Sequence, residues 1–281
     1  MSEDVLVSAL LPVHAGLDPA HLRRCLDSVA EQTRPPDELI VVEDGPLADE
    51  HVRVIAEAEA GPLTLVRVAL AQNGGAGLAN GAGLTRARGR WIAKIDADDI
   101  CLPERIERQL AFVDATGVDA CSTWLEEFDA DEGQVTAIRK VPTTHEAIAR
   151  GMRMNNPLNH PSSFYRRDVA LRAGGYPELR FMQDYDMFAR MLVGGARFAN
   201  MELPLVRFRA DATMFRRRTS QAMNHCEWEL QHNLRRYGLV STPRMWFNLM
   251  ARFTFRRLPP ALLRAVYRRL FHGHLPEGAT A

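Results

Sequence analysis

The stretch RWIAKIDADDICLPER, Arg90 to Arg105, decides the fold that we expect for this chain. Trp91 to Ile95 is a short apolar run of the kind that forms a buried strand. Three carboxylates, Asp96, Asp98 and Asp99, follow within four residues, at the point where such a strand ends. In open α/β sheets, ligands bind beyond the carboxyl ends of the strands. The stretch therefore predicts an α/β sheet with acidic side chains at its ligand-binding edge.

These acids have two interpretations. Hard divalent cations prefer oxygen ligands, and an ion such as Mg2+ usually takes one or two carboxylates together with substrate phosphates. If the strand continues, Asp96 and Asp98 share a face, so that one can contact a nucleotide and the other a metal ion. Alternatively, the acids form a turn and cap a helix, because Pro103 and Glu104 suit a first helical turn. This stretch alone does not decide between the two.

Apolar runs and amphipathic segments alternate on either side of this stretch. The predicted strands are residues 5–13, 38–42, 63–69, 91–95, 118–128 and 203–208. The predicted helices are residues 18–32, 48–60, 76–87, 105–116 and 182–192. Strands that alternate with helices indicate βαβ units. We therefore predict an α/β fold with a mainly parallel mixed sheet flanked by helices and a Rossmann-like nucleotide-binding half. The Asn- and Pro-rich segment 155–167 is predicted to be an ordered loop.

A glycine-rich run, NGGAGLANGAG at residues 73–83, follows the third predicted strand. It does not match the dinucleotide-binding fingerprint, which needs GxGxxG directly after the first strand. We interpret it as a loop that enters a helix of small residues. Two uses of that helix stay open: its backbone amides lie near a phosphate, or its small residues only allow close packing.

The composition excludes several classes of protein. The 281 residues carry 35 basic and 35 acidic side chains, so no net charge attracts the chain to nucleic acid. Cys25, Cys101, Cys121 and Cys226 have no metal-binding spacing and are typical of reduced packing residues in a cytosolic protein. No basic leader precedes the first apolar run, and no stretch reaches the ~20 apolar residues of a spanning helix. We expect a cytoplasmic protein or one that lies on a membrane surface.

Two carboxylates begin the predicted helix 182–192. Asp184 and Asp186 lie in its first turn, where the helix dipole stabilises a negative charge, so both can be simple caps. A carboxylate at the start of a helix can instead face a cleft and accept a proton from a substrate hydroxyl. His160 is interpreted as structural, because a lone histidine beside a proline is more often structural than a ligand. The basic loop 209–218 either closes over a diphosphate or is an ordinary solvated surface.

The C-terminal part of the chain has a different composition. Residues 221–271 are predicted to be helical, and residues 230–276 contain nine arginines and no acidic residue. Aromatic and leucine residues lie between these arginines, which favours a helix in a membrane interface. The alternatives are packing against the rest of the chain and a dimer contact. We therefore divide the chain into a domain at residues 1–218 and an Arg-rich helical extension at residues 219–281.

Five motifs follow one another along the chain: LLPVHAG at 10–16, ELIVVEDGP at 38–46, KIDADDICLPERIERQ at 94–109, NHPSSFYRRDVALRAGGY at 159–176 and QDYDMFARML at 183–192. Together they resemble the inverting glycosyltransferases of family 2, which have the GT-A fold. The tail is similar to the bacterial exopolysaccharide (amylovoran-type) transferases of that family. The resemblance covers nearly the whole chain.

This resemblance implies roles for individual residues. Asp184 matches the catalytic base of the family, and Asp98 matches the residue that ligates Mg2+ or Mn2+ on the diphosphate. The residues implied to bind the nucleotide sugar are Pro12, Val13, His14, Asp44, Asp96 and Arg209. Of these, Asp44 is expected to contact the base, beside the loop after the first strand, and Asp96 the ribose region.

The chain departs from the family pattern in two places. Gln183 stands before the base where a glutamate is usual. Many relatives carry YRxH after the last strand, whereas this chain reads Phe208-Arg209-Ala210-Asp211, so that histidine is missing. Asp211 or the arginines at 216–218 are expected to substitute for it.

The implied function is metal-dependent, inverting transfer of a hexosyl-type sugar from a nucleotide-diphosphate sugar, with a UDP-sugar favoured, to a hydroxyl of a saccharide acceptor. The expected acceptor is lipid-linked, in cell-surface or exopolysaccharide biosynthesis at the inner face of the membrane, and a homodimer is a further expectation. The alternative is a non-catalytic sugar-nucleotide-binding or membrane-docking module with a degenerate site. Only Gln183 and the missing histidine support it. A nucleotidyltransferase is not favoured, because its glycine-rich, lysine-containing loop is absent after Val13.

Overall fold

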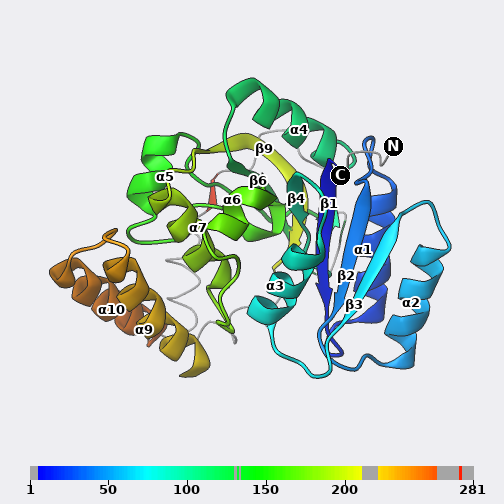
Figure 1. Cartoon of the computed structure of the whole chain (residues 1–281), viewed down its shortest axis with the longest axis horizontal. Helices are drawn as coiled ribbons and strands as arrows, with labels where there is room; N and C mark the ends of the chain where they lie inside the picture. Colours follow the sequence, from blue (N-terminus) through cyan, green and yellow to red (C-terminus); the bar gives the residue numbers. More distant parts are fainter. Residues whose placement is uncertain (1–5, 130–131, 133, 211–220, 258–271, 274–281) are drawn as a thin grey trace.

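A computed structural model describes residues 6–129, 132, 134–210, 221–257 and 272–273 of the chain. These residues form one ten-stranded mixed sheet with helices on both faces (Figure 1). The main path of the sheet runs in the order β10-β7-β6-β8-β4-β1-β2-β3. The α/β fold with a mixed, helix-flanked sheet that the sequence predicts is therefore confirmed.

The N-terminal half of the sheet is parallel. Its strands are β1 (Val7–Val13), β2 (Glu38–Glu43), β3 (Leu65–Ala69) and β4 (Trp91–Lys94). Helices α1 (Pro19–Ala30) and α2 (Asp49–Glu59) cover one face, and α3 (Ala76–Arg86) covers the other. The central strands β1 and β2 are apolar on both faces, as parallel strands covered by helices are.

The small residues of α3 allow this helix to approach the sheet closely. A Cβ atom on Gly83 would lie 2.1 Å from Cδ1 of Leu10, and one on Gly77 would lie 2.4 Å from the carbonyl oxygen of Pro177. Only glycine fits at these two positions without a shift of the buried Leu10 side chain or of the backbone at Pro177. Close packing, one of the two uses left open for the glycine-rich run, is therefore what the structure shows here.

The second half of the sheet is mixed: its short pairings are antiparallel, whereas its longest pairing, between β6 and β9, is parallel. Its strands are β5 (Ile100–Cys101), β6 (Ala120–Phe128), β7 (Ala137–Arg139), β8 (Phe164–Arg166), β9 (Phe198–Arg209) and β10 (His272–Gly273). Strand β8 lies between β4 and β6 and is antiparallel to both. The prediction of a loop throughout 155–167 is therefore wrong for its end. A three-residue strand has no readable periodicity, and its pairing comes from partners distant in the sequence.

The acids that follow β4 lie in a turn. The amide of Asp99 donates to the carbonyl oxygen of Asp96 (3.1 Å), and the chain then enters β5 before helix α4 (Arg105–Thr116) begins. The interpretation with Asp96 and Asp98 in a continuing strand is therefore wrong. The turn of the alternative interpretation is confirmed, but these acids do not cap the helix. Pairing of β5 with β9 separates the acidic turn from the helix by several residues.

Two helices of the C-terminal extension pack against the rest of the molecule. They are α9 (Gln221–Arg236) and α10 (Thr242–Arg256), and residues such as Leu230 and Leu249 share a core with Tyr185 and Met187 of helix α7 (Gln183–Val193). Packing against the rest of the chain is thus confirmed for one face of each helix. The remainder of the predicted helical tail, residues 258–271, lies outside the described residues. Within the described ranges, no helix is both long enough and apolar enough to cross a membrane.

Asp186 joins helix α7 to the extension. Its side chain is buried and forms an ion pair with Arg190 (2.7 Å). It also accepts hydrogen bonds from Asn233 of α9 and from the hydroxyl of Tyr237, the residue that follows α9, both at 3.1 Å. Burial first, and then the charge of Asp186 and the hydrogen bond to it, raise the pKa of the Tyr237 hydroxyl to about 12. Asp186 therefore has a structural role rather than a capping or catalytic one.

The change Asp186→Ala should lower the free energy of unfolding by about 3–5 kcal/mol, because it leaves Arg190 without its buried partner. Urea unfolding followed by tryptophan fluorescence measures this loss. The matched control is Asp168→Ala, which removes a half-exposed carboxylate that also pairs with two arginines, Arg166 and Arg172. The control should lose less than about 1 kcal/mol. Equal losses in the two variants would contradict the anchoring role of Asp186.

Candidate active site

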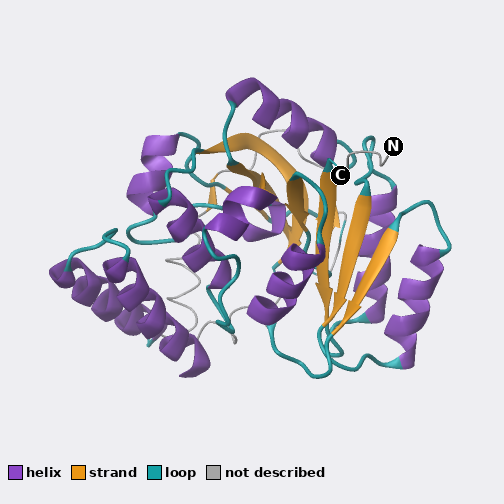
Figure 2. Ribbon diagram, viewed as in Figure 1, coloured by secondary structure: helices purple, strands orange, loops and turns teal. Residues whose placement is uncertain are grey.

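The predicted site residues of the first half of the chain lie at one edge of the sheet. Strands β1, β2 and β4 are parallel, with Val13 opposite Glu43 and Leu10 opposite Lys94. Their carboxyl ends therefore point to the same edge, which lies at the bottom of the view in Figure 2. This arrangement brings together Pro12–His14, Asp44 and the acidic turn at 96–99, as expected for ligand-binding loops of an open α/β sheet.

Asp44 orders the loop that leads into α3. Its buried carboxylate accepts hydrogen bonds from the side chain of Asn73 (2.9 Å) and from the backbone amides of Gly74 (2.7 Å) and Gly75 (3.0 Å). These two amides are therefore bonded to Asp44, which does not support the proposal that they bind a phosphate. Contact between Asp44 and a nucleotide base stays a prediction.

Two buried cations lie beneath the acidic turn. Lys94 is fully buried, and its ammonium group donates to Asp96 and to the carbonyl oxygen of Ile95. Arg105 is also buried and donates to the carbonyl oxygen of Lys94 (2.6 Å). Burial, the largest effect, would raise the pKa of Asp96, but Lys94, His160 and Arg105 together hold that pKa below its ordinary value. Asp96 is therefore an anion at neutral pH, partly exposed at the edge of the sheet.

Arg209 holds the far side of the turn. Its backbone amide donates to Oδ1 of Asp99 (2.9 Å), and its guanidinium donates to the carbonyl oxygen of Asp98 (3.2 Å) and to Glu132 (2.9 Å). The guanidinium also stacks on the ring of Phe128, 4.5 Å from its centroid. The guanidinium of Arg209 thus already bonds to protein atoms, which indicates that it supports the turn. Its contact with the donor stays a prediction. Asp211 and the arginines at 216–218 lie outside the described residues.

The acidic turn has the oxygen donors that a hard cation requires. Asp98 is partly exposed, and Oδ2 of Asp99 is buried with no hydrogen-bond partner in the described part of the chain. Burial and the charges of Asp98 and Asp96 raise the pKa of Asp99 well above its usual value. No group of three or more His, Cys, Asp or Glu side chains that could hold a metal occurs among the described residues. The donors therefore fit an ion that shares its shell with substrate oxygens, as Mg2+ does.

Asp184 stands in the first turn of α7, with its carboxylate partly exposed. Oδ2 accepts a hydrogen bond from Nδ2 of Asn156 (2.6 Å), and Oδ1 of Asn156 accepts from the amide of Leu158 (3.1 Å), which fixes the orientation of the amide. The helix begins after Met182, whose φ of 60° is the one positive value for a non-glycine residue in the described ranges. A strained residue beside a carboxylate is typical of functional sites.

His160 interacts electrostatically with both the predicted base and the acidic turn. It is close enough to Asp184 and to Asp96 for both carboxylates to act on its charge. Burial lowers the pKa of His160 below its ordinary value, Lys94 adds to this effect, and the two carboxylates oppose it. Nε2 of His160 also lies 3.0 Å from the hydroxyl of Tyr176, which in turn lies 3.0 Å from that of Tyr165. His160 thus connects two parts of the site that are far apart in the sequence.

Sequence reasoning missed Lys94 and Asn156 of this arrangement, and it interpreted His160 as structural. Lys94 is one of only two lysines in the chain, and the crowded polar segment NNPLNHP contains the other two. These were the available signals. Gln183, the departure next to Asp184, is buried.

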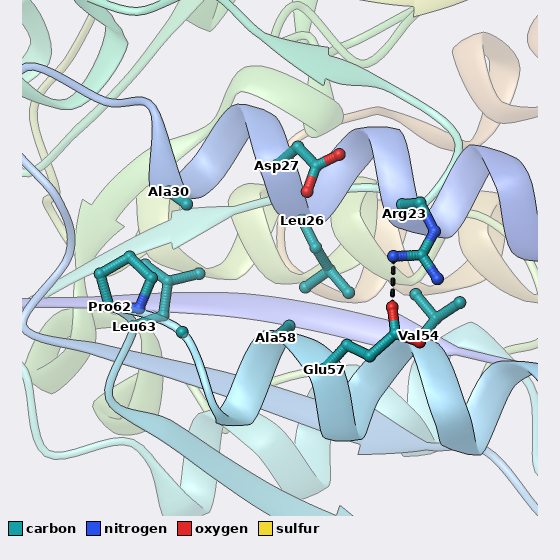
Figure 3. Close-up of a pocket in the computed structure, with 10 residues that line it drawn as sticks. Arg23, Leu26, Asp27, Ala30, Val54, Glu57, Ala58, Pro62 and Leu63 are labelled. Atoms are coloured by element: carbon teal, nitrogen blue, oxygen red, sulfur yellow. Dashed lines mark ion pairs between the residues drawn. The ribbon is translucent and has the colours of Figure 1, made fainter.

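A separate cavity of about 180 Å³ lies between α1 and α2 (Figure 3). The ion pair between Arg23 and Glu57 (2.5 Å) crosses it. Its lining residues include none of the predicted site residues, so we do not assign it a part in the chemistry of the sheet edge.

Several glycosyltransferases are similar to this chain over almost its full length. An uncharacterised glycosyltransferase of Haemophilus influenzae is 32% identical over 93% of this chain and 97% of its own length. The amylovoran biosynthesis glycosyltransferase AmsE of Erwinia amylovora is 30% identical, covering 94% and 98% of the two chains. The UDP-Gal:alpha-D-GlcNAc-diphosphoundecaprenol beta-1,3-galactosyltransferase of Escherichia coli is 28% identical, covering 98% and 100%.

Solved structures share the fold at lower identity. TarS residues 1–349 of S. aureus, in complex with UDP-GlcNAc, has a TM-score of 0.65 at 17% identity and matches 94% of this chain and 75% of its own. The mannosyltransferase PcManGT of Pyrobaculum calidifontis, in complex with GDP-Man and Mn2+, has a TM-score of 0.63 at 17% identity, covering 98% and 78%. Residues 8–174 match the family described as Glycosyl transferase family 2. The chain therefore belongs to glycosyl transferase family 2, has the GT-A fold, and is a glycosyltransferase with homologues in exopolysaccharide and lipid-linked sugar biosynthesis.

Proposed function

We propose that this protein transfers a hexosyl-type sugar from a nucleotide-diphosphate sugar, with a UDP-sugar favoured, to a hydroxyl of a saccharide acceptor, with inversion at the anomeric carbon. The observation that carries the proposal is the position of Asp184. It lies in the first turn of α7, is oriented by the hydrogen bond from Asn156 (2.6 Å), and acts together with Asp96 of the ligand-binding edge on the charge of His160. The galactosyltransferase relative, which is named for a UDP-Gal donor, and the UDP-GlcNAc complex of TarS support the choice of donor.

In this reaction Asp184 acts as the general base. The acceptor oxygen forms a bond to the anomeric carbon while the bond from that carbon to the diphosphate breaks, and Asp184 takes the hydroxyl proton. Oδ2 is held by Asn156, whereas Oδ1 accepts no hydrogen bond from the described residues, so Oδ1 is the oxygen that we assign to the proton. The nucleoside diphosphate leaves with the bonding electrons on the face opposite the incoming hydroxyl.

We propose Asp98 as the protein ligand of a Mg2+ or Mn2+ ion, a role that the Mn2+ complex of PcManGT supports. When bound, such an ion supplies positive charge next to the departing diphosphate. Lys94 and Arg105 offset the charge of Asp96 from below, and Arg209 supports the turn, so the protein holds the acidic group in place before the donor arrives.

The remaining parts of the proposal concern binding and location. Pro12, Val13, His14 and Asp44 surround the nucleotide base of the donor, and Asp96 binds its ribose region.

Residues 1–218 form the transferase domain, and residues 219–281 form an extension. The acceptor is lipid-linked and is used at the cytoplasmic face of a membrane, on which the extension lies, in agreement with the diphosphoundecaprenol-linked sugar in the name of the Escherichia coli relative. We also propose that two copies of this chain associate as a homodimer.

The test is nucleotide release by the full chain from a panel of UDP-, GDP- and dTDP-sugars with Mn2+ or Mg2+. Slow hydrolysis of one donor, lost in Asp98→Ala, is the expected result and identifies the donor class. Absence of both hydrolysis and nucleotide binding across the panel would overturn the proposal in favour of a non-catalytic module.

The change Asn156→Ala should lower kcat by about 10- to 100-fold with little change in the KM of the donor, because a hydrogen bond to a charged group is worth ~1.5–3 kcal/mol. The loss falls on kcat because Asn156 orients the catalytic base, Asp184, and does not contact the donor. The matched control is Asn155→Ala, which removes a bond to Arg252 and none to Asp184. Equal loss of kcat in both variants would show that general disorder of the loop, and not the bond to Asp184, is responsible.

A further inference from the structure

The surface formed by α5 and the C-terminal helices carries a hollow of about 470 Å³. It lies between the end of α5 (His145–Gly151) with the turn that follows it and the turn at 238–241 that joins α9 to α10. Three arginines line it: Arg150, Arg153 and Arg244. All three are exposed, and the lining contains no carboxylate. We refer to it below as the arginine hollow.

The arginine hollow concentrates positive charge that the described residues do not neutralise. None of its three arginines forms an ion pair with a carboxylate in the described part of the chain. Other arginines of the extension are used internally: Arg252 and Arg256 both pair with the buried Glu227. Guanidinium groups that face one hollow repel each other, and a bound anion removes this repulsion.

The start of α10 adds to this field. Ser241 caps the helix by accepting a hydrogen bond from the amide of Arg244 (3.4 Å), and both residues line the hollow. The first turn of a helix of this length carries a partial positive charge. Guanidinium groups match the geometry of phosphate oxygens, so the chemical class of ligand that fits the arginine hollow is a phosphate group.

An exposed aromatic surface adjoins the arginine hollow. It consists of Trp246 (47% exposed), Phe247 (57%) and Met250 (69%) on α10 with Trp228 (41%) on α9. The rings of Trp228 and Trp246 lie 5.6 Å apart, and the guanidinium of Arg244 lies 5.5 Å from the centroid of Phe247. Arg244 therefore belongs to both features. Exposed aromatic side chains beside basic ones are typical of protein surfaces that enter the interface of an anionic membrane.

We propose that this surface binds an anionic phospholipid bilayer, with a lipid phosphate in the arginine hollow and Trp246 and Phe247 in the interface. The inference deepens the location given under the proposed function but does not depend on catalysis. It also connects the membrane to the base. Asn248 of α10 holds the carbonyl oxygen of Arg153 (2.9 Å), and Asn156, three residues further on, holds Asp184. A membrane-bound acceptor would thus meet the protein close to the segment that orients the base.

The experiment measures partitioning of the full chain onto vesicles of phosphatidylcholine with and without phosphatidylglycerol. The triple variant Arg150→Gln, Arg153→Gln, Arg244→Gln should partition onto the anionic vesicles on the order of 100-fold more weakly, since each basic residue near such a surface contributes roughly tenfold or less. The control triple is Arg53→Gln, Arg86→Gln, Arg90→Gln, which removes the same charge from exposed arginines of the N-terminal half. It should retain the partitioning of the unchanged protein. Equal losses in both triples would overturn the proposal.

Two further measurements distinguish a lipid phosphate from inorganic phosphate, and a membrane from a second copy of this chain. Phe247→Ser should weaken binding to both kinds of vesicle, and brominated lipids should quench tryptophan fluorescence only when the arginine hollow is intact. Binding of inorganic phosphate without any binding of vesicles, or a dimer that Phe247→Ser dissociates in solution, would overturn the membrane assignment. Donor hydrolysis is measured in the same preparations. Its absence in a protein that still binds vesicles would contradict the proposed transfer and leave the membrane inference standing.

Discussion

Replacing Asp184 by asparagine should lower turnover by about 10²–10⁴-fold, the range that general-base catalysis contributes. The change preserves the shape of the side chain, and its remaining carbonyl oxygen can still accept the hydrogen bond from Asn156. It removes the capacity to accept a proton from the acceptor hydroxyl. The measurement is nucleotide release with the donor that the panel identifies, together with the affinity for that donor by titration calorimetry.

The affinity for the donor should stay within about twofold of the unchanged protein, because the base acts on the acceptor and its loss belongs to kcat. The control is Asp114→Asn, which neutralises an exposed carboxylate of α4. Near-normal turnover in Asp184→Asn would remove Asp184 from the mechanism. Loss of donor affinity to the same extent as turnover would instead assign Asp184 to donor binding.

The elements that position Asp184 differ in how readily the sequence predicts them. The parallel half of the sheet was predictable, because its central strands β1 and β2 are apolar on both faces and each is followed by an amphipathic helix. Strand β8 was not, since its three residues pair with β4 and β6, which are remote in the sequence. This short strand begins four residues after His160, whose charge Asp184 and Asp96 both affect, and so helps to fix the position of His160.

The two acids of α7 illustrate the same limit at the level of side chains. Asp184 and Asp186 stand two residues apart in a first helical turn, and a helix dipole acts on both in the same way. Their roles separate only through their partners. Asp186 pairs with Arg190 and accepts a hydrogen bond from Asn233 of α9, whereas Asp184 accepts a hydrogen bond from Asn156. Such partners are set by tertiary packing, so the resemblance to a family could assign Asp184 but the local pattern could not.

The arginines of the extension divide in a comparable way. The sequence shows a basic, aromatic tail and so indicates a membrane surface or a packing face. Both features are present on the same helices. Arg252 and Arg256 pair with the buried Glu227 and hold the extension in place, while Arg244 points to the hollow and the exposed aromatic surface. Charge counted along a sequence therefore overestimates the charge that a surface presents.

Replacing Asp98 by alanine should abolish the part of nucleotide-diphosphate affinity that depends on a metal ion. Loss of residues that only orient metal ligands costs ~10- to 100-fold in metal affinity, so loss of a direct ligand should cost at least about 100-fold. Titration calorimetry with UDP, in Mn2+ and then in excess chelator, measures both affinities. For the unchanged protein the two should differ, and for Asp98→Ala they should coincide.

The turn itself should survive this change, because the hydrogen bond from the Arg209 guanidinium is accepted by the backbone carbonyl of Asp98, which the substitution keeps. Asp99 keeps its bond to the amide of Arg209. A thermal unfolding curve close to that of Asp114→Ala, the exposed control, would show that the fold is intact. If UDP still bound more tightly with Mn2+ than with chelator, the ligand would have to be another oxygen of the turn. Oδ2 of Asp99, buried and without a partner among the described residues, is then the donor that the geometry offers, and Asp99→Asn would test it.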